Sequence, residues 1–176
     1  MILWINGAFG AGKTTVAELT AKKIEGSYIY DPETAGFFLW EALPEEIRMP
    51  ENFQHLPLWR EMNYRILKYM DTHYRGTIIV PMTIYNRVYY NEIIGRLRED
   101  GADVRHFILT AGKETLLKRL VLRGDSENGW AARHIDACLS AFASEITEVK
   151  IDTEEKTPEE IVSEIICRCE INDSQL

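Results

Sequence analysis

The sequence predicts an α/β fold, a parallel sheet covered by helices. Patterns typical of strands and of helices alternate along all 176 residues, which favours parallel strands joined by helical crossovers. A glycine-rich loop follows the first strand pattern and precedes the first helix pattern, an order typical of nucleotide-binding α/β proteins. No repeat, low-complexity tract or interdomain linker interrupts the chain, so we expect a single domain over residues 1–176.

The glycine-rich loop, residues 7–14, matches the phosphate-binding pattern G-x-x-x-x-G-K-[ST], the Walker A motif. Its glycines permit backbone angles at which successive N–H groups point at one anion, and the helix that follows adds its own N-terminal N–H groups. We expect Lys13 to reach the β- and γ-phosphates of a nucleoside triphosphate and the Thr14 hydroxyl to bind Mg²⁺. The nucleotide-binding residues are therefore predicted to be Gly7, Ala8, Phe9, Gly10, Ala11, Gly12, Lys13, Thr14 and Thr15.

Short apolar runs rich in β-branched and aromatic residues predict the strands, and apolar residues at helical spacing predict the helices. Strands are expected at residues 2–5, 27–30, 77–80, 104–109 and 149–151. Helices are expected at residues 15–24, 32–43, 57–74, 86–100, 113–123, 130–142 and 158–170.

Several helix ends carry recognisable signals. Asp31 and Asn86 are suitable N-cap residues, and Thr157 opens a capping box with proline at the first helical position. Gly76 and Gly101 are expected to end the helices that precede them. These signals separate the elements without requiring any long unstructured connection.

Asp31 is the first candidate outside the loop, because ligands of open α/β sheets bind beyond the carboxyl ends of strands. Its carboxylate is predicted to accept a proton from a substrate hydroxyl or to hold Mg²⁺ through water; an N-cap role alone is the alternative. The third strand ends at Pro81-Met82-Thr83 and supplies no acidic residue. Many P-loop ATPases orient Mg²⁺ with an aspartate at such a place, so that task falls here to Asp31 or to water.

The acceptor site is expected above the sheet, between the helices of residues 32–74. Arg60 is one candidate, with a solvated arginine beside a core tryptophan as the alternative. Thr83 and Arg87 lie just past the third strand and face the same crevice in this interpretation, and Phe37 lies on the helix that follows Asp31. The predicted substrate-binding residues are Asp31, Phe37, Arg60, Thr83 and Arg87.

A polar loop bracketed by glycines, residues 124–130, is predicted to be a short mobile lid. Arg119, Arg123 and Arg133 flank it, and cationic groups there suit stabilisation of a transferring phosphoryl group. The alternative for the first two is favourable charge at a helix C-terminus. The predicted catalytic residues are Lys13, Asp31, Arg119, Arg123 and Arg133. His106 falls inside a strand and is interpreted as a packed histidine rather than a base.

Composition excludes several classes of protein. The net charge of −8 argues against general binding of nucleic acids or anionic membranes. No apolar run approaches the roughly 20 residues of a membrane span, and no signal peptide is visible. The three cysteines do not suggest a disulfide framework. We expect a cytoplasmic protein, with peripheral association at a membrane left open.

The residues resemble a known group, the tunicamycin-resistance proteins within the nucleoside-monophosphate kinase and shikimate kinase branch of P-loop proteins. The resemblance covers most of the chain as far as about residue 142. Its most specific parts are Pro57-Leu58-Trp59-Arg60 and Val80-Pro81-Met82-Thr83. The stretches that carry it are residues 4–10, 30–33, 57–60, 80–84, 91–98 and 114–120.

This resemblance implies a five-stranded parallel sheet in the order 2-3-1-4-5 and ATP on the loop of residues 7–14. It implies that the adenine lies near Arg119 and the Asp152-Thr153 loop, and that an acceptor or antibiotic site is bounded by Asp31, Arg60, Thr83 and the lid. Asp31 matches an acidic position at the end of the second strand of shikimate kinases.

Two functions remain open from the sequence. The first is an ATP- and Mg²⁺-dependent phosphotransferase whose small-molecule acceptor, by resemblance, is a nucleoside antibiotic such as tunicamycin. The second is an ATP-binding protein that sequesters the antibiotic without phosphoryl transfer, which the missing acidic residue after the third strand favours. A GTPase switch is disfavoured because no Asn-Lys-x-Asp stretch occurs.

Overall fold

The computed structural model describes residues 1–48 and 51–169. Within them, five parallel strands form one sheet in the order β2-β3-β1-β4-β5. Both the parallel sheet and the order implied by the resemblance are therefore confirmed. The strands are β1 (Ile2–Gly7), β2 (Tyr28–Ile29), β3 (Ile78–Pro81), β4 (Val104–Thr110) and β5 (Val149–Asp152).

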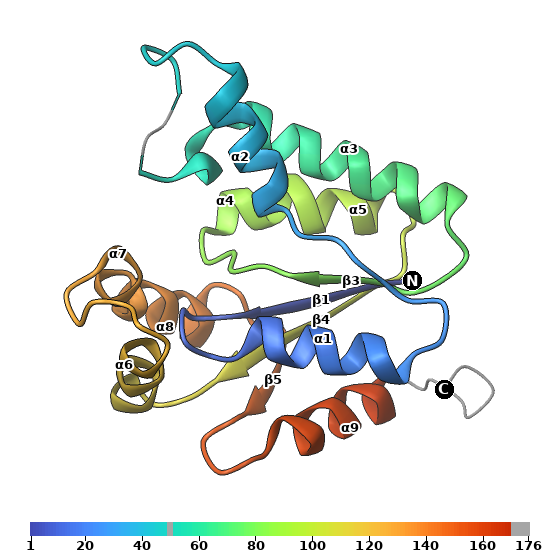
Figure 1. Cartoon of the computed structure of the whole chain (residues 1–176). Coiled ribbons are helices and arrows are strands. Elements are labelled where there is room, and N and C mark those ends of the chain that lie inside the picture. The colour runs from blue at the N-terminus through green and yellow to red at the C-terminus, as the bar shows by residue number, and fades with distance from the viewer. Residues whose placement is uncertain (49–50, 170–176) are drawn as a thin grey trace.

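Helices cover both faces of this sheet: α1 and α9 lie side by side on one face, and α3 and α5 lie on the other (Figure 1). Helix α4, the π-helical turn η2 and α5 follow one another without a break. The helices are α1 (Lys13–Lys23), α2 (Glu33–Ala42), η1 (Phe53–His55), α3 (Pro57–His73), α4 (Arg87–Tyr90), η2 (Asn91–Gly95), α5 (Arg96–Glu99), α6 (Lys113–Leu122), α7 (Trp130–Arg133), α8 (Ile135–Ser144) and α9 (Pro158–Arg168).

Two of the three helix starts predicted from capping residues are confirmed, whereas α2 begins one residue later than predicted, with Pro32 rather than Asp31 at the N-cap position. The Asn86 side chain accepts hydrogen bonds from the backbone N–H groups of Val88 and Tyr89, and Thr157 and Glu160 form the capping box of α9. Such caps satisfy N–H groups that the helix itself leaves unpaired. Helix α9 is described as far as Arg168, and the predicted end at Glu170 lies outside the described residues.

The single helix predicted over residues 130–142 is wrong, because α7 and α8 are separate helices that meet at His134. The His134 Nδ1 atom lies 2.7 Å from the Trp130 carbonyl oxygen, which is the oxygen that the His134 backbone N–H would engage in a regular helix. That N–H bonds the Ala131 carbonyl instead. A side chain competing for the backbone thus breaks the helix.

Strand β1 is the centre of the fold, and every one of its residues is buried. It pairs with β3 on one side and with β4 on the other. The Trp4 indole N–H also donates to the Met82 carbonyl oxygen at 3.1 Å, which fixes the segment after β3 against β1. The loop that leaves β1 therefore starts from a rigid support. Over the described residues, no helix combines the length and apolar character needed to cross a membrane.

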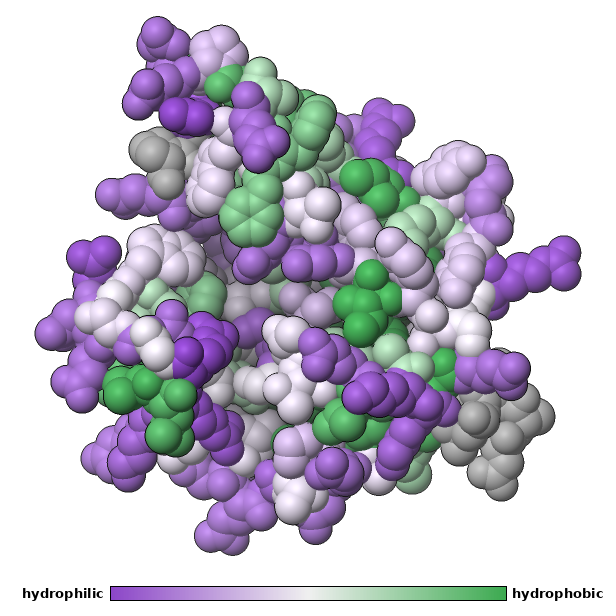
Figure 2. All heavy atoms as spheres, in the orientation of Figure 1, coloured by the Kyte–Doolittle hydropathy of each residue, from purple (hydrophilic) through white to green (hydrophobic). Residues whose placement is uncertain are grey.

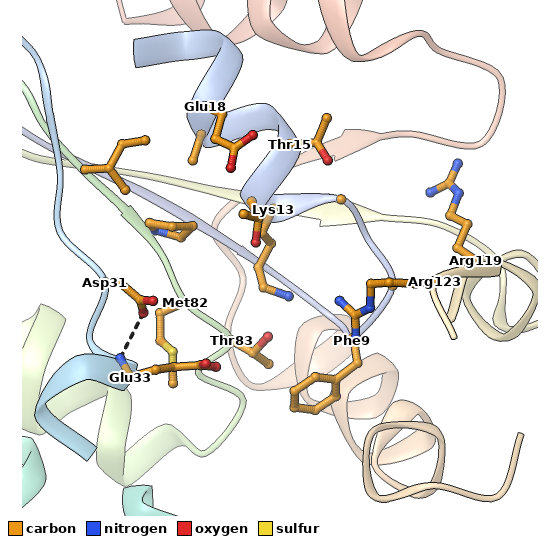
Figure 3. Close-up of a pocket in the computed structure, with 16 residues that line it drawn as sticks. Phe9, Lys13, Thr15, Glu18, Asp31, Glu33, Met82, Thr83, Arg119 and Arg123 are labelled. Atoms are coloured by element: carbon orange, nitrogen blue, oxygen red, sulfur yellow. Dashed lines mark hydrogen bonds between the residues drawn. The ribbon is translucent and has the colours of Figure 1, made fainter. Parts of the chain in front are cut away.

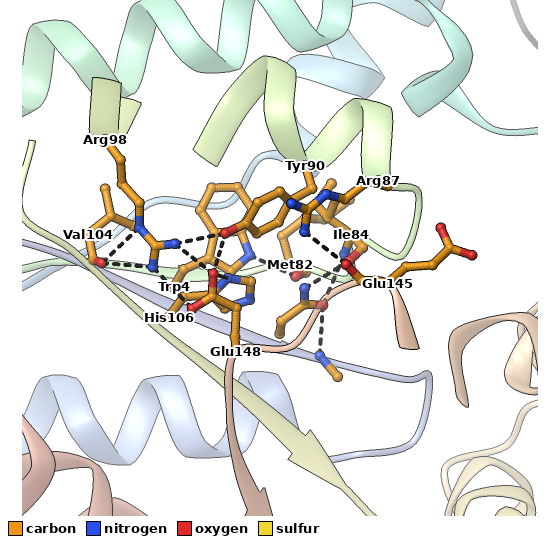
Figure 4. Close-up of polar contacts among 12 residues, drawn as sticks. Trp4, Met82, Ile84, Arg87, Tyr90, Arg98, Val104, His106, Glu145 and Glu148 are labelled. Carbon is orange, nitrogen blue, oxygen red and sulfur yellow. Dashed lines mark hydrogen bonds and ion pairs between the residues drawn. The ribbon is translucent and has the colours of Figure 1, made fainter. Parts of the chain in front are cut away.

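A polar cluster ties the helix of residues 87–99 to the segment that leads into β5 (Figure 4). Arg98 donates to the Glu148 carboxylate at 2.6 Å and to the Tyr90 hydroxyl at 2.7 Å. His106 is buried beside this cluster, as predicted, and burial lowers its pKa to about 3. The imidazole is therefore neutral at physiological pH and serves as a packed ring.

Candidate active site

The loop between β1 and α1 has the backbone conformation that its glycines were expected to allow. Gly7, Gly10 and Gly12 have φ angles of 146°, 84° and 91°, a region that residues with a side chain rarely adopt. A Cβ atom on Gly10 would lie 2.6 Å from the Leu116 carbonyl oxygen. The absence of a side chain at Gly10 thus lets the loop pass close to α6.

Lys13, the first residue of α1, folds back over this loop. Its Nζ atom donates to the carbonyl oxygens of Gly7 at 3.1 Å and Ala8 at 3.0 Å. It also lies 5.6 Å from the centre of the Phe9 ring. Desolvation lowers its pKa to about 8, so the amine remains mostly protonated at neutral pH and would gain further stabilisation from a phosphate.

Two buried polar side chains hold the loop to the segment that follows β3. The Asn6 side chain accepts from the N–H groups of Gly7 at 2.8 Å and Ile84 at 3.0 Å and donates to the Ile84 carbonyl. The Thr83 hydroxyl donates to the Gly7 carbonyl oxygen at 2.8 Å. Sequence reasoning assigned no role to Asn6, because its partner is distant in the chain.

The loop opens into a cavity of about 860 Å³, drawn in Figure 3. Figure 2 shows the surface hollowed between the helices around α2 and α3 and the group formed by α6, α7 and α8. The lining residues are Phe9, Gly10, Gly12, Lys13, Thr14, Thr15, Ala17, Glu18, Ile29, Asp31, Glu33, Pro81, Met82, Thr83, Arg119 and Arg123. The cavity therefore joins the phosphate-binding loop to the carboxyl ends of β2 and β3.

Two carboxylates, Asp31 and Glu33, stand on the wall opposite Lys13 (Figure 3). Asp31 accepts a hydrogen bond from the Glu33 backbone N–H at 2.9 Å, which fixes the turn that leads into α2. Burial and the neighbouring Asp31 charge raise the pKa of Glu33, although Lys13 and Arg123 oppose the shift. The sequence analysis singled out Asp31 and not Glu33, although the spacing of two residues between these carboxylates was an available signal.

The arginines predicted around the lid occupy different positions. Arg119 and Arg123 line the cavity, whereas Arg133 does not. Arg119 donates to the Thr153 hydroxyl at 2.9 Å and to the Thr153 carbonyl oxygen at 2.7 Å, so these two predicted nucleotide-binding residues are in contact. Arg123 is paired with Asp125 of the lid at 2.7 Å. Its side chain reaches the cavity from the end of α6.

Three residues predicted to bind the acceptor lie outside the cavity wall. Arg60 is buried and engages Glu92 and the Gln54 carbonyl oxygen. Arg87 donates to the Glu145 carbonyl oxygen at 2.8 Å. Phe37 is half exposed on α2 and packs edge-on against Trp40 and Phe53. Their part in acceptor binding stays a prediction. The part of Asp152 in nucleotide binding also stays a prediction; its side chain accepts from the Glu154 N–H.

Oxygen donors at the cavity suit Mg²⁺, which prefers carboxylates, hydroxyls, water and substrate phosphates. Thr14, Asp31 and Glu33 all line the cavity. Within residues 1–48 and 51–169, no cluster of three histidine, cysteine or acidic residues could hold a metal alone. This arrangement fits an ion that is held largely by a nucleotide.

The structure is similar to three solved proteins over nearly the whole chain. The Deinococcus radiodurans tunicamycin resistance protein has a TM-score of 0.83 at 26% identity, with 97% of this chain and 96% of that chain covered. A sugar kinase from Janibacter sp. HTCC2649 has a TM-score of 0.67 at 19% identity, covering 98% and 96%. Shikimate kinase from Bacteroides thetaiotaomicron has a TM-score of 0.60 at 17% identity, covering 97% and 99%.

No protein-family model matches the sequence, and no curated protein does. The sugar kinase and the shikimate kinase are 19% and 17% identical to this chain, so their similarity shows a shared fold only. The chain thus has a P-loop, kinase-like fold and is similar over nearly its full length to the Deinococcus tunicamycin resistance protein, as its sequence motifs predicted.

Proposed function

We propose that this protein is an ATP- and Mg²⁺-dependent phosphotransferase that acts on a hydroxyl group of a small molecule. The observation that carries the proposal is the cavity itself. One wall is the phosphate-binding loop with Lys13, and the facing wall presents Asp31 and Glu33. Charges on both sides of one space suit phosphoryl transfer, in which positioning and electrostatics supply most of the catalysis.

In the proposed reaction the acceptor oxygen attacks the γ-phosphorus of ATP. The bond between that phosphorus and the β,γ-bridging oxygen breaks, ADP leaves, and the hydroxyl proton passes to the carboxylate of Glu33 or Asp31. Lys13 and Arg123 would stabilise the charge on the moving group. Mg²⁺, held by the Thr14 hydroxyl and reached by Asp31 through water, would neutralise phosphate charge.

The nucleotide base is assigned to the other end of the loop, near Arg119, Asp152 and Thr153. Arg119 holds this segment through its bonds to the Thr153 hydroxyl and to the Thr153 carbonyl oxygen, and its own side chain borders the cavity. The contact joins α6 to the loop after β5. It supports placing the base there, on the side of the phosphates away from Asp31.

Tunicamycin is the acceptor or ligand to test first, because a tunicamycin resistance protein is similar to this chain. A second candidate function is sequestration of such a compound without chemistry. The absence of an acidic residue at the end of β3, where Pro81, Met82 and Thr83 line the cavity, favours it. The Glu33 carboxylate favours the phosphotransferase, since it supplies a second acidic group to the same space.

Mass spectrometry separates the two candidates. The protein is incubated with ATP, Mg²⁺ and tunicamycin, with uridine and sugars as parallel acceptors, and ADP is measured alongside. A mass gain of one phosphate on any acceptor supports phosphoryl transfer. Tight binding of unaltered tunicamycin supports sequestration. Failure of the wild-type protein to bind ATP would contradict both.

A further inference from the structure

The last residue of the lid, Trp130, packs on the phosphate-binding loop. Its indole meets the Phe9 ring edge-on, with ring centres 5.0 Å apart and ring planes inclined at 74°. Phe9 belongs to the loop and lines the cavity, whereas Trp130 is the first residue of α7 and is not among the lining residues. Any effect of Trp130 on a bound nucleotide must therefore pass through its neighbours.

The Phe9 ring also lies beside the ammonium group of Lys13. The Lys13 Nζ atom is 5.6 Å from the ring centre, within the range of a cation–π contact. Figure 3 shows Phe9, Lys13, Arg123 and Thr83 around the same opening. Phe9 thus connects the lid to the part of the cavity in which the terminal phosphate of a nucleotide would lie.

The other end of the lid adjoins Arg123, whose side chain lines the cavity. One Asp125 oxygen lies 2.8 Å from the Arg123 Nε atom and 2.7 Å from Nη2, while Nη1 has no hydrogen bond to a described residue. The pKa of Lys13 is lowered mainly by desolvation, and the Arg123 charge adds to this shift. The two cations therefore repel each other across the cavity, and a phosphate group between them would remove this repulsion.

The lid is short and braced by hydrogen bonds, so its two ends are mechanically connected. Six residues, 124–129, separate Arg123 from Trp130. The Asp125 backbone N–H bonds a carbonyl oxygen of α6 at 3.0 Å, and the Gly129 N–H bonds the Ser126 carbonyl oxygen at 2.9 Å. A displacement of Trp130 should therefore alter the position of Arg123.

We propose that the Phe9–Trp130 contact holds the lid in the position from which Arg123 reaches the γ-phosphate. Phe9 and Trp130 are then positioning residues for the end of ATP that is transferred. This inference rests on the proposed function, which assigns Arg123 to the moving phosphoryl group. Because ADP has no γ-phosphate, the contact should strengthen the binding of ATP more than that of ADP.

The ratio of the ADP dissociation constant to that of a non-hydrolysable ATP analogue, measured by calorimetry with Mg²⁺, tests the inference. Arg123→Ala should lower this ratio by about tenfold or more, because a charge-assisted hydrogen bond is lost. Trp130→Ala and Phe9→Ala should each lower it by roughly twofold to tenfold, the contribution expected of an aromatic pair. Trp130→Phe keeps a ring and should restore most of the ratio. In the Arg123→Ala background, Trp130→Ala should change the ratio no further.

Phe38→Ala is the matched control, because Phe38 is 57% exposed on α2 and is not among the lining residues. It should leave the ratio unchanged, and thermal unfolding checks that each variant is folded. A merely structural role for Trp130 would weaken the binding of both nucleotides equally. The inference is overturned if Trp130→Ala leaves the ratio unchanged, or lowers it equally with and without Arg123. Failure of the proposed function looks different: the ratio responds as expected, yet the wild type phosphorylates no acceptor.

Discussion

The phosphate-binding half of the molecule and its acceptor half are built by different means. In the first, β1, the loop of residues 7–14 and α1 follow one another in sequence, and the loop conformation depends on nearby glycines. In the second, side chains from α2 and from the end of β3 line one cavity although they lie far apart in the chain. The phosphate-binding half depends on residues that are neighbours in sequence, whereas the acceptor half depends on tertiary packing. Substitutions in the two halves should therefore have different effects.

The largest effect is expected in the phosphate-binding half, from Lys13→Ala. Removing its ammonium group leaves the loop without its only side-chain cation, and loss of one such charge-stabilising group costs roughly 10²–10³-fold in turnover. ATP binding by calorimetry and ADP release should both fall.

Lys22→Ala provides the matched control for Lys13, because Lys22 lies on the same helix and is exposed. It should leave ATP binding and turnover unchanged. Unaltered ATP binding in Lys13→Ala would remove the loop from the proposed reaction.

The second-largest effect on turnover is expected in the acceptor half, from Glu33→Gln. A positioned general base typically contributes about 10²–10⁴-fold, and Asp31 would retain part of that, so kcat should fall by about tenfold to a hundredfold. The raised pKa of Glu33 makes the wild-type rate decline on acidification at a higher pH than an ordinary carboxyl group would. The glutamine variant should lose this limb of the pH profile.

The same substitution should act in the opposite direction on stability. Because the Glu33 pKa is higher in the folded than in the unfolded chain, the folded state binds the proton more tightly, and folding is favoured at pH values below that pKa. At neutral pH the ionised Glu33 carboxylate destabilises the folded state, so the Glu33→Gln variant should unfold at a slightly higher temperature. A drop in both rate and stability would assign Glu33 to structure alone.

Within the acceptor half, Arg60→Ala tests whether Arg60 stabilises the fold or binds the acceptor. The Arg60 side chain is 9% exposed, pairs with Glu92 and lies 4.3 Å from the Tyr89 ring centre. Glu92 remains 44% exposed, so we expect a loss of about 2–3 kcal/mol in the free energy of unfolding. Chemical denaturation measures it.

Arg65→Ala is the control for Arg60, since Arg65 forms an exposed ion pair with Glu61 on the same helix. Exposed pairs contribute about 0–1 kcal/mol, so its effect should be small. A stable Arg60→Ala protein with weakened acceptor binding would instead place Arg60 in the acceptor site.

The outcome for particular residues shows what the sequence could predict. The strands, the loop and most helix ends depend on patterns within short windows, and these agree with the structure. The strand order, which only the resemblance implied, agrees as well. The positions of Arg60, Phe37 and Arg87 depend on helix rotation and on partners such as Glu92, which lies 32 residues from Arg60. Asn6 was not recognised for the same reason, because its side chain bonds Ile84, which lies 78 residues away.

The smallest expected effect concerns Thr83, which joins the two halves. Its hydroxyl donates to the Gly7 carbonyl oxygen, which also accepts from Lys13. Thr83→Val removes one of these bonds and should cost about 1 kcal/mol of stability, whereas Thr83→Ser retains it. If Thr83 serves mainly to anchor the loop, the KM for ATP rises by less than about tenfold and the KM for the acceptor is unchanged. A rise in the acceptor KM alone would assign Thr83 to the acceptor half, as its place on the cavity wall also allows.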